Sequence, residues 1–289
     1  MHATLERLLT SPPVITDGAW GTELQARGLP VGACPETWNL ERPADVEAVA
    51  RAYVDAGSQV VLTNTFGGSS VTLRRHGLAD RAAEINRLGV ELSRKGADGR
   101  ASVFGSLGPS GVVLMMGEVS EEELQASFRE QARAMADAGA DGIVIETMTD
   151  PAELRLAIRA ARETGLPVVA CMVFDAGPQK DRTMMGTTPE QAASAMIEEG
   201  ADVIGSNCGQ GVAGFVEICN RLREAADGRP VWIKANRGLP ELRDGQAAYI
   251  QTPEQFAAEV PALIAAGASF IGGCCGTTPE FITAVRKVL

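Results

Sequence analysis

Eight short apolar runs alternate with helical patterns along the chain, and this alternation limits the possible folds more than any other feature. Each run holds consecutive apolar side chains rather than an apolar/polar alternation, which is typical of parallel strands covered on both faces. The helical patterns between them end in glycine, as at Gly57, Gly139, Gly165, Gly200 and Gly267, where a left-handed residue commonly ends a helix. The runs span residues 14–20, 59–65, 102–107, 142–147, 167–174, 203–208, 230–236 and 270–276.

Eight strands, each followed by a helix, are the number that closes a small barrel. A length of 289 residues suits one such barrel, which takes about 250 residues. The chain shows no Pro/Ser-rich linker or low-complexity segment that would divide it. We therefore predict an α/β fold, a (β/α)8 TIM barrel, with residues 1–289 as a single domain. An open doubly wound sheet is the alternative, although no typical nucleotide-binding fingerprint supports it.

Charge and composition exclude several classes of partner. The formal net charge of −11 argues against nucleic acid and against an anionic membrane surface. No run of about 18 apolar residues is present, and the first residues lack the basic start and apolar stretch of a signal peptide. We therefore expect a cytoplasmic protein. Six cysteines in a chain of this size indicate metal ligands or nucleophiles rather than a disulfide framework.

Polar residues follow most of the predicted strands, at the end where barrel enzymes place their active sites. The pairs are Asp17-Gly18, Asn64-Thr65, Glu146-Thr147, Asn207-Cys208 and Cys274-Cys275, together with Asn236. Three of the six cysteines therefore lie at the expected catalytic rim. The two histidines, His2 and His76, lie at no strand end, which argues against a histidine general base at this rim.

The adjacent cysteines Cys274 and Cys275 are the most informative pair. Their Cα atoms lie only about 3.8 Å apart, which strains a disulfide between them. The glycines around them free the backbone to turn both sulfurs to one side. With Cys208 they would form a three-thiolate site with one open position, a pattern typical of catalytic zinc. Two alternatives stay open: packed thiols without a metal, and a phosphate site at the glycine-rich turn before the last helix.

An open zinc site of this kind can bind a substrate thiol as thiolate. Beyond this chemistry, the segments DGAWGTELQARG, LTNTFGGSS, ADVIGSNCG and GGCCGTTPEFI resemble the homocysteine S-methyltransferase family in order and approximate spacing. The resemblance covers residues 14–288. The sequence looks most similar to the homocysteine-binding domain of cobalamin-dependent methionine synthase, and also to betaine- and S-methylmethionine-dependent homocysteine methyltransferases.

The resemblance implies a (β/α)8 enzyme that methylates homocysteine to methionine, with zinc bound by Cys208, Cys274 and Cys275. It also implies substrate-binding residues, whereas no catalytic residue is expected beyond the metal site. Asp17 and Glu146 would hold the substrate ammonium, Gly18 and Thr65 would contact the amino-acid moiety, and Asn236 is placed by its strand end and a loosely matching motif. Ser106 and Asn207 would support these residues.

The substrate residues also have structural interpretations. Asp17 could cap a turn, and Thr65 could pair with loop backbone. Glu146 follows an apolar strand, where a carboxylate is costly to bury without a cationic partner, and this favours a functional role. We interpret Cys34, Cys171 and Cys219 as structural.

The methyl donor is less constrained than the acceptor. Three Trp and two Tyr provide little material for the aromatic cage that a quaternary ammonium such as betaine calls for. No folate or cobalamin domain is evident in the chain. We therefore expect a separate corrinoid (methylcobalamin) protein or S-methylmethionine as the donor. Two functions remain alternatives: a zinc-thiolate binding or sensing barrel, and a methyltransferase acting on another thiol or a selenol.

Overall fold

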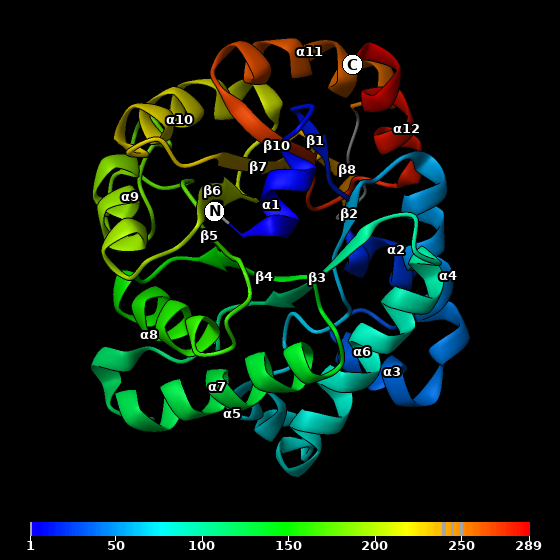
Figure 1. The fold of residues 1–289 in the computed structure, drawn as a ribbon, viewed down its shortest axis with the longest axis vertical. Helices are drawn as coiled ribbons and strands as arrows, with labels where there is room; N and C mark the ends of the chain where they lie inside the picture. The colour runs from blue at the N-terminus through cyan, green and yellow to red at the C-terminus, as the bar shows by residue number, and fades with distance from the viewer. Residues whose placement is uncertain (1, 239–240, 244–245, 249–250) are drawn as a thin grey trace.

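The computed structural model describes residues 2–238, 241–243, 246–248 and 251–289, and its main feature is a closed parallel barrel (Figure 1). Its eight strands are hydrogen-bonded in the order β1-β10-β7-β6-β5-β4-β3-β2. A parallel bridge between Thr16 and Val60 joins the first strand of this order to the last. The (β/α)8 prediction is therefore confirmed, and the open doubly wound sheet is wrong. The strands are β1 (Val14–Ile15), β2 (Val60–Val61), β3 (Ser102–Leu107), β4 (Gly142–Met148), β5 (Val168–Met172), β6 (Val203–Asn207), β7 (Val231–Ala235) and β10 (Ala268–Gly273).

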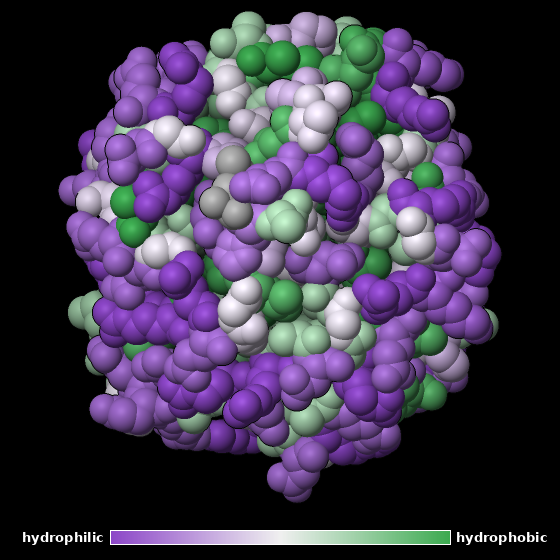
Figure 2. All heavy atoms as spheres, viewed as in Figure 1, coloured by the Kyte–Doolittle hydropathy of each residue, from purple (hydrophilic) through white to green (hydrophobic). Residues whose placement is uncertain are grey.

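Helices form a ring outside the strands (Figure 1). Space-filling Figure 2 shows mostly hydrophilic side chains on the face presented there, as expected for helices that turn their apolar sides to the barrel. Within the described residues, no helix combines the length and apolar character needed to cross a bilayer. The helices are α1 (Ala3–Leu8), α2 (Trp20–Ala26), α3 (Trp38–Glu41), α4 (Pro43–Ala56), α5 (Ser70–Leu73), α6 (Ala82–Ala97), α7 (Glu121–Asp137), α8 (Pro151–Arg162), α9 (Pro189–Glu198), α10 (Val212–Ala225), α11 (Pro253–Ala265) and α12 (Pro279–Val288).

The helix boundaries follow from local sequence signals. Thr188 and Thr252 each form a capping box at the start of α9 and α11, and a proline occupies the first turn of both helices. Gly57 follows α4 with φ 113°, and Gly267 follows α11 with φ 99°. A side chain at such a φ is strained, so glycine is required where these helices stop.

Two parts of the fold differ from the sequence-based expectation. The ladders of β1 and β2 are much shorter than the predicted residues 14–20 and 59–65 because a side chain replaces part of the backbone pairing. The Ile15 N–H donates to the Gln59 side-chain oxygen at 2.9 Å. Helix α1 and a small antiparallel hairpin, β8 (Glu241–Arg243) with β9 (Gln246–Ala248), were also not expected.

The barrel interior consists of an apolar lower part and a polar upper layer. Phe104, Trp232 and Phe270 stack across the axis, with ring centroids 6.4 and 5.0 Å apart. Gly205 makes room for them, since a Cβ there would lie 2.1 Å from the Trp232 carbonyl oxygen. Leu5 and Leu8 of α1 belong to the same buried cluster, so α1 closes the amino-terminal end of the barrel, where Figure 1 shows it crossing the strands.

Side chains alternate along a strand, so the residues two positions after the apolar layer also point inward. At this level the interior turns polar. The residues concerned are Ser106, Glu146, Asn207 and Lys234. They come from four different strands and, together with Cys274 just after β10, meet at the carboxyl end of the barrel, where the fold places its functional site.

Candidate active site

A cavity of about 420 Å³ opens at the carboxyl end of the barrel. Its walls come from the carboxyl ends of β3, β4, β7 and β10 and from the loops that follow β1, β2, β3, β6 and β10, so segments distant in sequence share one space. The polar side chains that line it include Glu146, Lys234, Cys208, Cys274 and Cys275. Convergent polar groups in such a concave site are what a small ligand needs.

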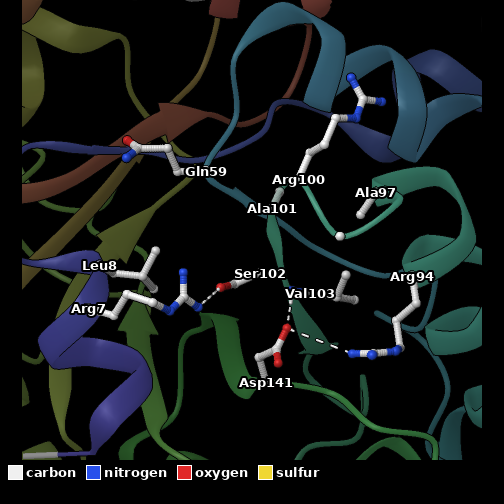
Figure 3. Close-up of a pocket in the computed structure, with 11 residues that line it drawn as sticks. Arg7, Leu8, Gln59, Arg94, Ala97, Arg100, Ala101, Ser102, Val103 and Asp141 are labelled. Carbon is white, nitrogen blue, oxygen red and sulfur yellow. Dashed lines mark hydrogen bonds and ion pairs between the residues drawn. The ribbon is translucent and has the colours of Figure 1, made fainter.

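A second cavity, of about 380 Å³, lies at the opposite end of the barrel (Figure 3). Its polar groups bind one another. Arg7 donates to the Ser102 hydroxyl at 2.8 Å, and the Asp141 carboxylate accepts from the Val103 N–H at 2.8 Å. Arg94 approaches the same carboxylate at 4.0 Å. These contacts join the amino-terminal ends of the strands, so we place the functional site at the other cavity.

Three cysteine sulfurs converge at the carboxyl-end cavity. The Sγ atoms of Cys208, Cys274 and Cys275 all lie within 4.8 Å of one another. The Cys208 and Cys275 sulfurs are 3.7 Å apart. Tetrahedral zinc with bonds of about 2.3 Å to sulfur requires sulfur–sulfur distances of about 3.8 Å. The donor set and its spacing therefore fit a metal ion of this kind, and the cysteines are not disulfide-bonded.

Strand β7 positions both sides of the cysteine cluster. The Cys208 N–H donates to the Lys234 carbonyl at 3.1 Å, and the Cys274 N–H donates to the Ala235 carbonyl at 2.6 Å. Cys208 has φ 65°, a left-handed conformation that is costly for a residue with a side chain. Such strain is maintained only where the surroundings enforce it, and it concentrates at functional sites.

The three thiols share their protons unequally. Hydrogen bonds from Cys274 and Cys275 lower the pKa of Cys208 to about 3. The hydrogen bond to Cys208 is the main reason that the pKa of Cys275 rises to about 11. Cys208 is therefore the thiol of the cluster that most readily becomes a thiolate, and a bound cation would favour the thiolate form of all three because metal ligands must be thiolates.

Asp17 is completely buried and receives three donors. Its Oδ1 accepts from the Lys234 ammonium at 2.5 Å. Its Oδ2 accepts from the Trp20 indole N–H at 2.8 Å and from the Leu62 N–H at 2.7 Å. The neighbouring Gly18 lines the cavity with backbone, and a Cβ there would lie 2.9 Å from Thr277 and Tyr53 atoms. Asp17 thus lies just behind the cavity wall.

Lys234 is a site residue that sequence reasoning missed. It lies in the otherwise apolar run 230–236, and its side chain is 3% exposed. The nearby carboxylates of Asp17 and Glu146 raise the pKa of Lys234 against the opposing effect of burial. A lysine within a strand covered on both faces needs a buried partner of opposite charge. The presence of a lysine in this apolar run was therefore the signal by which the sequence could have identified Lys234.

Glu146 faces the cavity and has capacity for another donor. One oxygen accepts from the Ser106 hydroxyl, and the other lies 3.5 Å from the Asn207 amide nitrogen. Burial raises the pKa of Glu146, and the Lys234 charge partly offsets this rise. The pairing of β4 with β5 is irregular between Ile145 and Met148, so Glu146 lies where β4 departs from regular strand geometry.

Asn207 holds this irregular segment in place. Its Oδ1 accepts from the Thr147 N–H at 2.7 Å, and its Nδ2 donates to the Thr147 hydroxyl at 2.8 Å. Thr147 is left-handed, with φ 65°. Asn207 also approaches the Cys274 sulfur at 3.7 Å. It therefore connects the Glu146 strand end with the cysteine cluster.

Comparison with known proteins identifies the family. A family model described as homocysteine S-methyltransferase matches residues 14–289. The chain belongs to the homocysteine S-methyltransferase family. The family expected from the sequence motifs is thereby confirmed.

Several members of the homocysteine S-methyltransferase family are similar over the whole chain. Identity is 33% to the methionine synthase of Mycobacterium tuberculosis, covering 98% of this chain and 25% of that protein. Identity is 30% to betaine–homocysteine S-methyltransferase 1 of Danio rerio, covering 100% of this chain and 76% of that protein. The metallated homocysteine methyltransferase MmuM of Escherichia coli superposes with a TM-score of 0.82 at 25% identity, covering 98% and 99% of the two chains. The chain spans about a quarter of the length of the methionine synthases it matches.

Two further residues that the sequence predicts to bind substrate, Thr65 and Asn236, are not among the residues that line the cavity. The Thr65 hydroxyl is buried and donates to the Ser106 carbonyl at 2.7 Å. Asn236 is 7% exposed, and its side chain favours the thiolate of Cys208. Substrate contacts by Thr65 and Asn236 stay predictions, whereas their observed contacts support the backbone and the cysteine cluster.

The other cysteines are all buried, as a structural role requires. Cys171 lies in the barrel interior and Cys219 in α10. Cys34 is buried too, but it borders the cavity and its thiol approaches Glu36 at 3.2 Å. Burial is the main reason that the pKa of Cys34 rises to about 12, so it remains a thiol.

Proposed function

We propose that this chain transfers a methyl group to the sulfur of homocysteine, forming methionine, with zinc held by Cys208, Cys274 and Cys275. The observation that carries the proposal is the convergence of three sulfurs within 4.8 Å beside a buried carboxylate in one cavity. Membership of the homocysteine S-methyltransferase family supports it.

The donor set agrees with zinc. Three soft thiolates favour zinc over magnesium or calcium, and three protein ligands leave a position for a substrate atom. Bound there, zinc would keep the substrate sulfur deprotonated at neutral pH while leaving it nucleophilic. The protein supplies the placement: β7 holds the backbone of both cysteine segments, and the Asn236 and Asn207 amides lie beside the sulfurs.

Charge balance supports Glu146 as the ammonium site. The cavity region buries three carboxylates, Asp17, Glu36 and Glu146, but one cation, Lys234. Glu36 accepts from the Gly67 N–H at 2.6 Å and from the Cys34 thiol at 3.2 Å. Asp17 and Lys234 form a pair, which leaves Glu146 without a full counter-charge. A substrate ammonium would supply it, and a buried carboxylate gains most from such a partner. We further propose that Asp17 acts mainly by positioning Lys234, since its carboxylate lies behind the cavity wall and already accepts from three donors.

The remaining substrate contacts are proposed from position. Gly18 presents backbone to the cavity because no side chain fits beneath Thr277. Thr65 secures the Ser106 backbone, and Ser106 in turn binds Glu146. Asn236 lies beside Cys208. These residues shape the pocket around the two ends of the amino acid.

For the donor, we propose a separate corrinoid protein or S-methylmethionine. The cavity is lined by the aromatic side chains of Trp20 and Phe66, together with His76. The Trp20 indole N–H donates to Asp17. Trp38 is 5% exposed and packs in the core. These rings make a poor cage for betaine.

Exposed apolar side chains favour a protein as the donor. They lie on the loops after β3 and β5, at the same end of the barrel as the cysteines: Val113, Met115, Met116, Met184 and Met185. Exposed apolar groups of this kind are typical of surfaces that contact other proteins. A cytoplasmic location is part of the proposal, because a reducing compartment keeps a three-thiol site free of disulfides.

Metal content and coordination test the metal part of the proposal. Purified, reduced protein should contain about one zinc per chain, with three sulfur neighbours by zinc-edge X-ray absorption and four after homocysteine is added. Cys219→Ala serves as the control because this cysteine lies in α10, away from the cluster. A shell that ignores homocysteine would contradict the substrate-thiolate role.

Transfer assays test the reaction itself. Homocysteine is offered with methylcobalamin, S-methylmethionine or betaine, and methionine is quantified. We expect methionine with one of the first two donors. Turnover with betaine alone would refute the donor proposal, and no methionine with any donor would refute the reaction.

A further inference from the structure

The Lys234 ammonium is a buried cation with hydrogen-bonding capacity to spare. An ammonium carries three N–H donors, and within the described residues Asp17 is its recorded acceptor. Lys234 borders the same cavity as Glu146 and the cysteines. Leaving charged donors unpaired in a buried site is costly, so the cavity should supply acceptors when a ligand is bound.

Fold stability does not explain why this ion pair is present. A buried ion pair is often no more stabilising than apolar residues of similar volume. Asp17 already accepts from two other donors, the Trp20 and Leu62 N–H groups. An amide at position 17 would keep an oxygen for these two N–H groups, so they do not require a charge there.

Lys234 borders the cavity although its side chain is only 3% exposed. In the sheet register its partners are Asn207 on β6 and Gly272 on β10. Gly272 has no side chain, and a Cβ there would lie 1.9 Å from the Thr16 hydroxyl and 2.6 Å from the Asp17 carbonyl oxygen. This close approach of β1 to β10 is what lets Asp17 reach Lys234 across the intervening strand.

We propose that Lys234 binds the α-carboxylate of the amino-acid thiol and thereby determines specificity for an amino acid over a simple aminothiol. The inference rests on the proposed function and adds a contact for the substrate carboxylate to those proposed for its sulfur and its ammonium. The sulfur would meet the cysteine cluster, the ammonium would meet Glu146, and the carboxylate would meet the free donors of Lys234. Because the ammonium and carboxylate share one carbon atom, the two protein groups that bind them must face the same space, and Lys234 and Glu146 both line this cavity.

Calorimetric titration of the zinc-loaded protein with two thiols tests this assignment. Homocysteine carries both groups, whereas 3-aminopropane-1-thiol is the same molecule without the carboxylate. The wild type should bind homocysteine about 10- to 100-fold more tightly, as expected for a hydrogen-bonded charge pair. The double variant Asp17→Asn/Lys234→Met removes both charges together and should bind the two thiols within about threefold of each other.

Cys219→Ala, in α10 and away from the cavity, is the matched control and should keep the full preference for homocysteine. Asp17→Asn alone removes the carboxylate that positions Lys234, so its preference should fall between those of the wild type and the double variant. Lys234→Gln, which keeps an N–H donor toward Asp17, provides a second variant if the double variant does not fold, and it should also lose most of the preference.

The outcomes separate the two proposals. If a folded Lys234 variant keeps the full preference for homocysteine, the carboxylate assignment is wrong while methyl transfer to homocysteine stands. If the preference depends on Lys234 but the wild type transfers no methyl group, the assignment stands and the proposed reaction fails. Wild-type protein that binds the two thiols equally overturns the assignment directly.

Discussion

Removing the Asn207 side chain should separate substrate binding from metal binding. Asn207→Ala leaves the Thr147 N–H and hydroxyl without the partners they have at 2.7 and 2.8 Å. An unpaired N–H of this kind costs about 1–3 kcal/mol, and we expect the free energy of unfolding to fall by that amount. Thr147 also has φ 65°, which costs about 1–2 kcal/mol for a residue with a side chain. Without Asn207 nothing balances that cost.

The end of β4 should then relax and displace Glu146, which precedes Thr147. Loss of one charge-assisted hydrogen bond, about 1.5–3 kcal/mol, lowers homocysteine affinity at least about tenfold. Zinc retention should change little, because the cysteine backbone is held by β7. Urea denaturation, calorimetry with homocysteine and zinc analysis measure the three quantities.

Thr147→Gly provides the rescue. Glycine adopts a left-handed φ without strain, so Asn207→Ala/Thr147→Gly should recover homocysteine affinity to within about threefold of wild type. An Asn207→Ala protein that is destabilised but binds homocysteine normally would refute the view that Asn207 positions Glu146 through Thr147.

The other predictions concern the metal, the ammonium and a surface ion pair. Cys274→Ser and Cys208→Ala should abolish zinc retention and methyl transfer while leaving the circular dichroism of the barrel unchanged; full activity in either would contradict the metal site. Glu146→Gln should weaken binding of homocysteine more than that of 4-sulfanylbutanoate, which lacks the ammonium, and an equal loss for both would argue that Glu146 serves the fold. Hydrogen bonds from Arg221 lower the pKa of Glu190 to about 2, so the charged form is favoured in the folded state. This contribution is present above the usual pKa of 4.5 and lost as the pH falls toward 2. Because the pair is largely exposed, Glu190→Gln should lower the free energy of unfolding by less than about 1 kcal/mol at pH 7 and by nothing at pH 2; a loss that is independent of pH would refute the ion-pair explanation.

Local patterns were sufficient for the barrel and for the cysteines. Runs of apolar residues between helices that end in glycine are read from adjacent residues, and their number alone indicated closure of the sheet. Cys208, Cys274 and Cys275 stand at strand ends, so the rule that barrel sites lie at the carboxyl ends brought them together before any coordinates were known. The structure brings their sulfurs within 4.8 Å.

The partners of the polar side chains depended on tertiary structure. Lys234 and Asp17 are separated by 217 positions in the chain, and their pairing requires β10 between them to carry Gly272. The hydrogen bond from the Thr147 N–H to the Asn207 side chain likewise joins β4 to β6 across β5.

The sequence by itself determined the fold class, the family and the candidate metal-binding cysteines, because strand and helix periodicity and the cysteine motif are local properties. Only the tertiary structure decided which charges neutralise one another. A buried charge is costly without a partner of opposite charge, and this holds for each charged side chain in the upper layer of the barrel. The strand order and register decide which partner lies within reach. For that reason Asp17, expected to face the substrate, is paired with Lys234, and Glu146 is left with an oxygen open to the cavity.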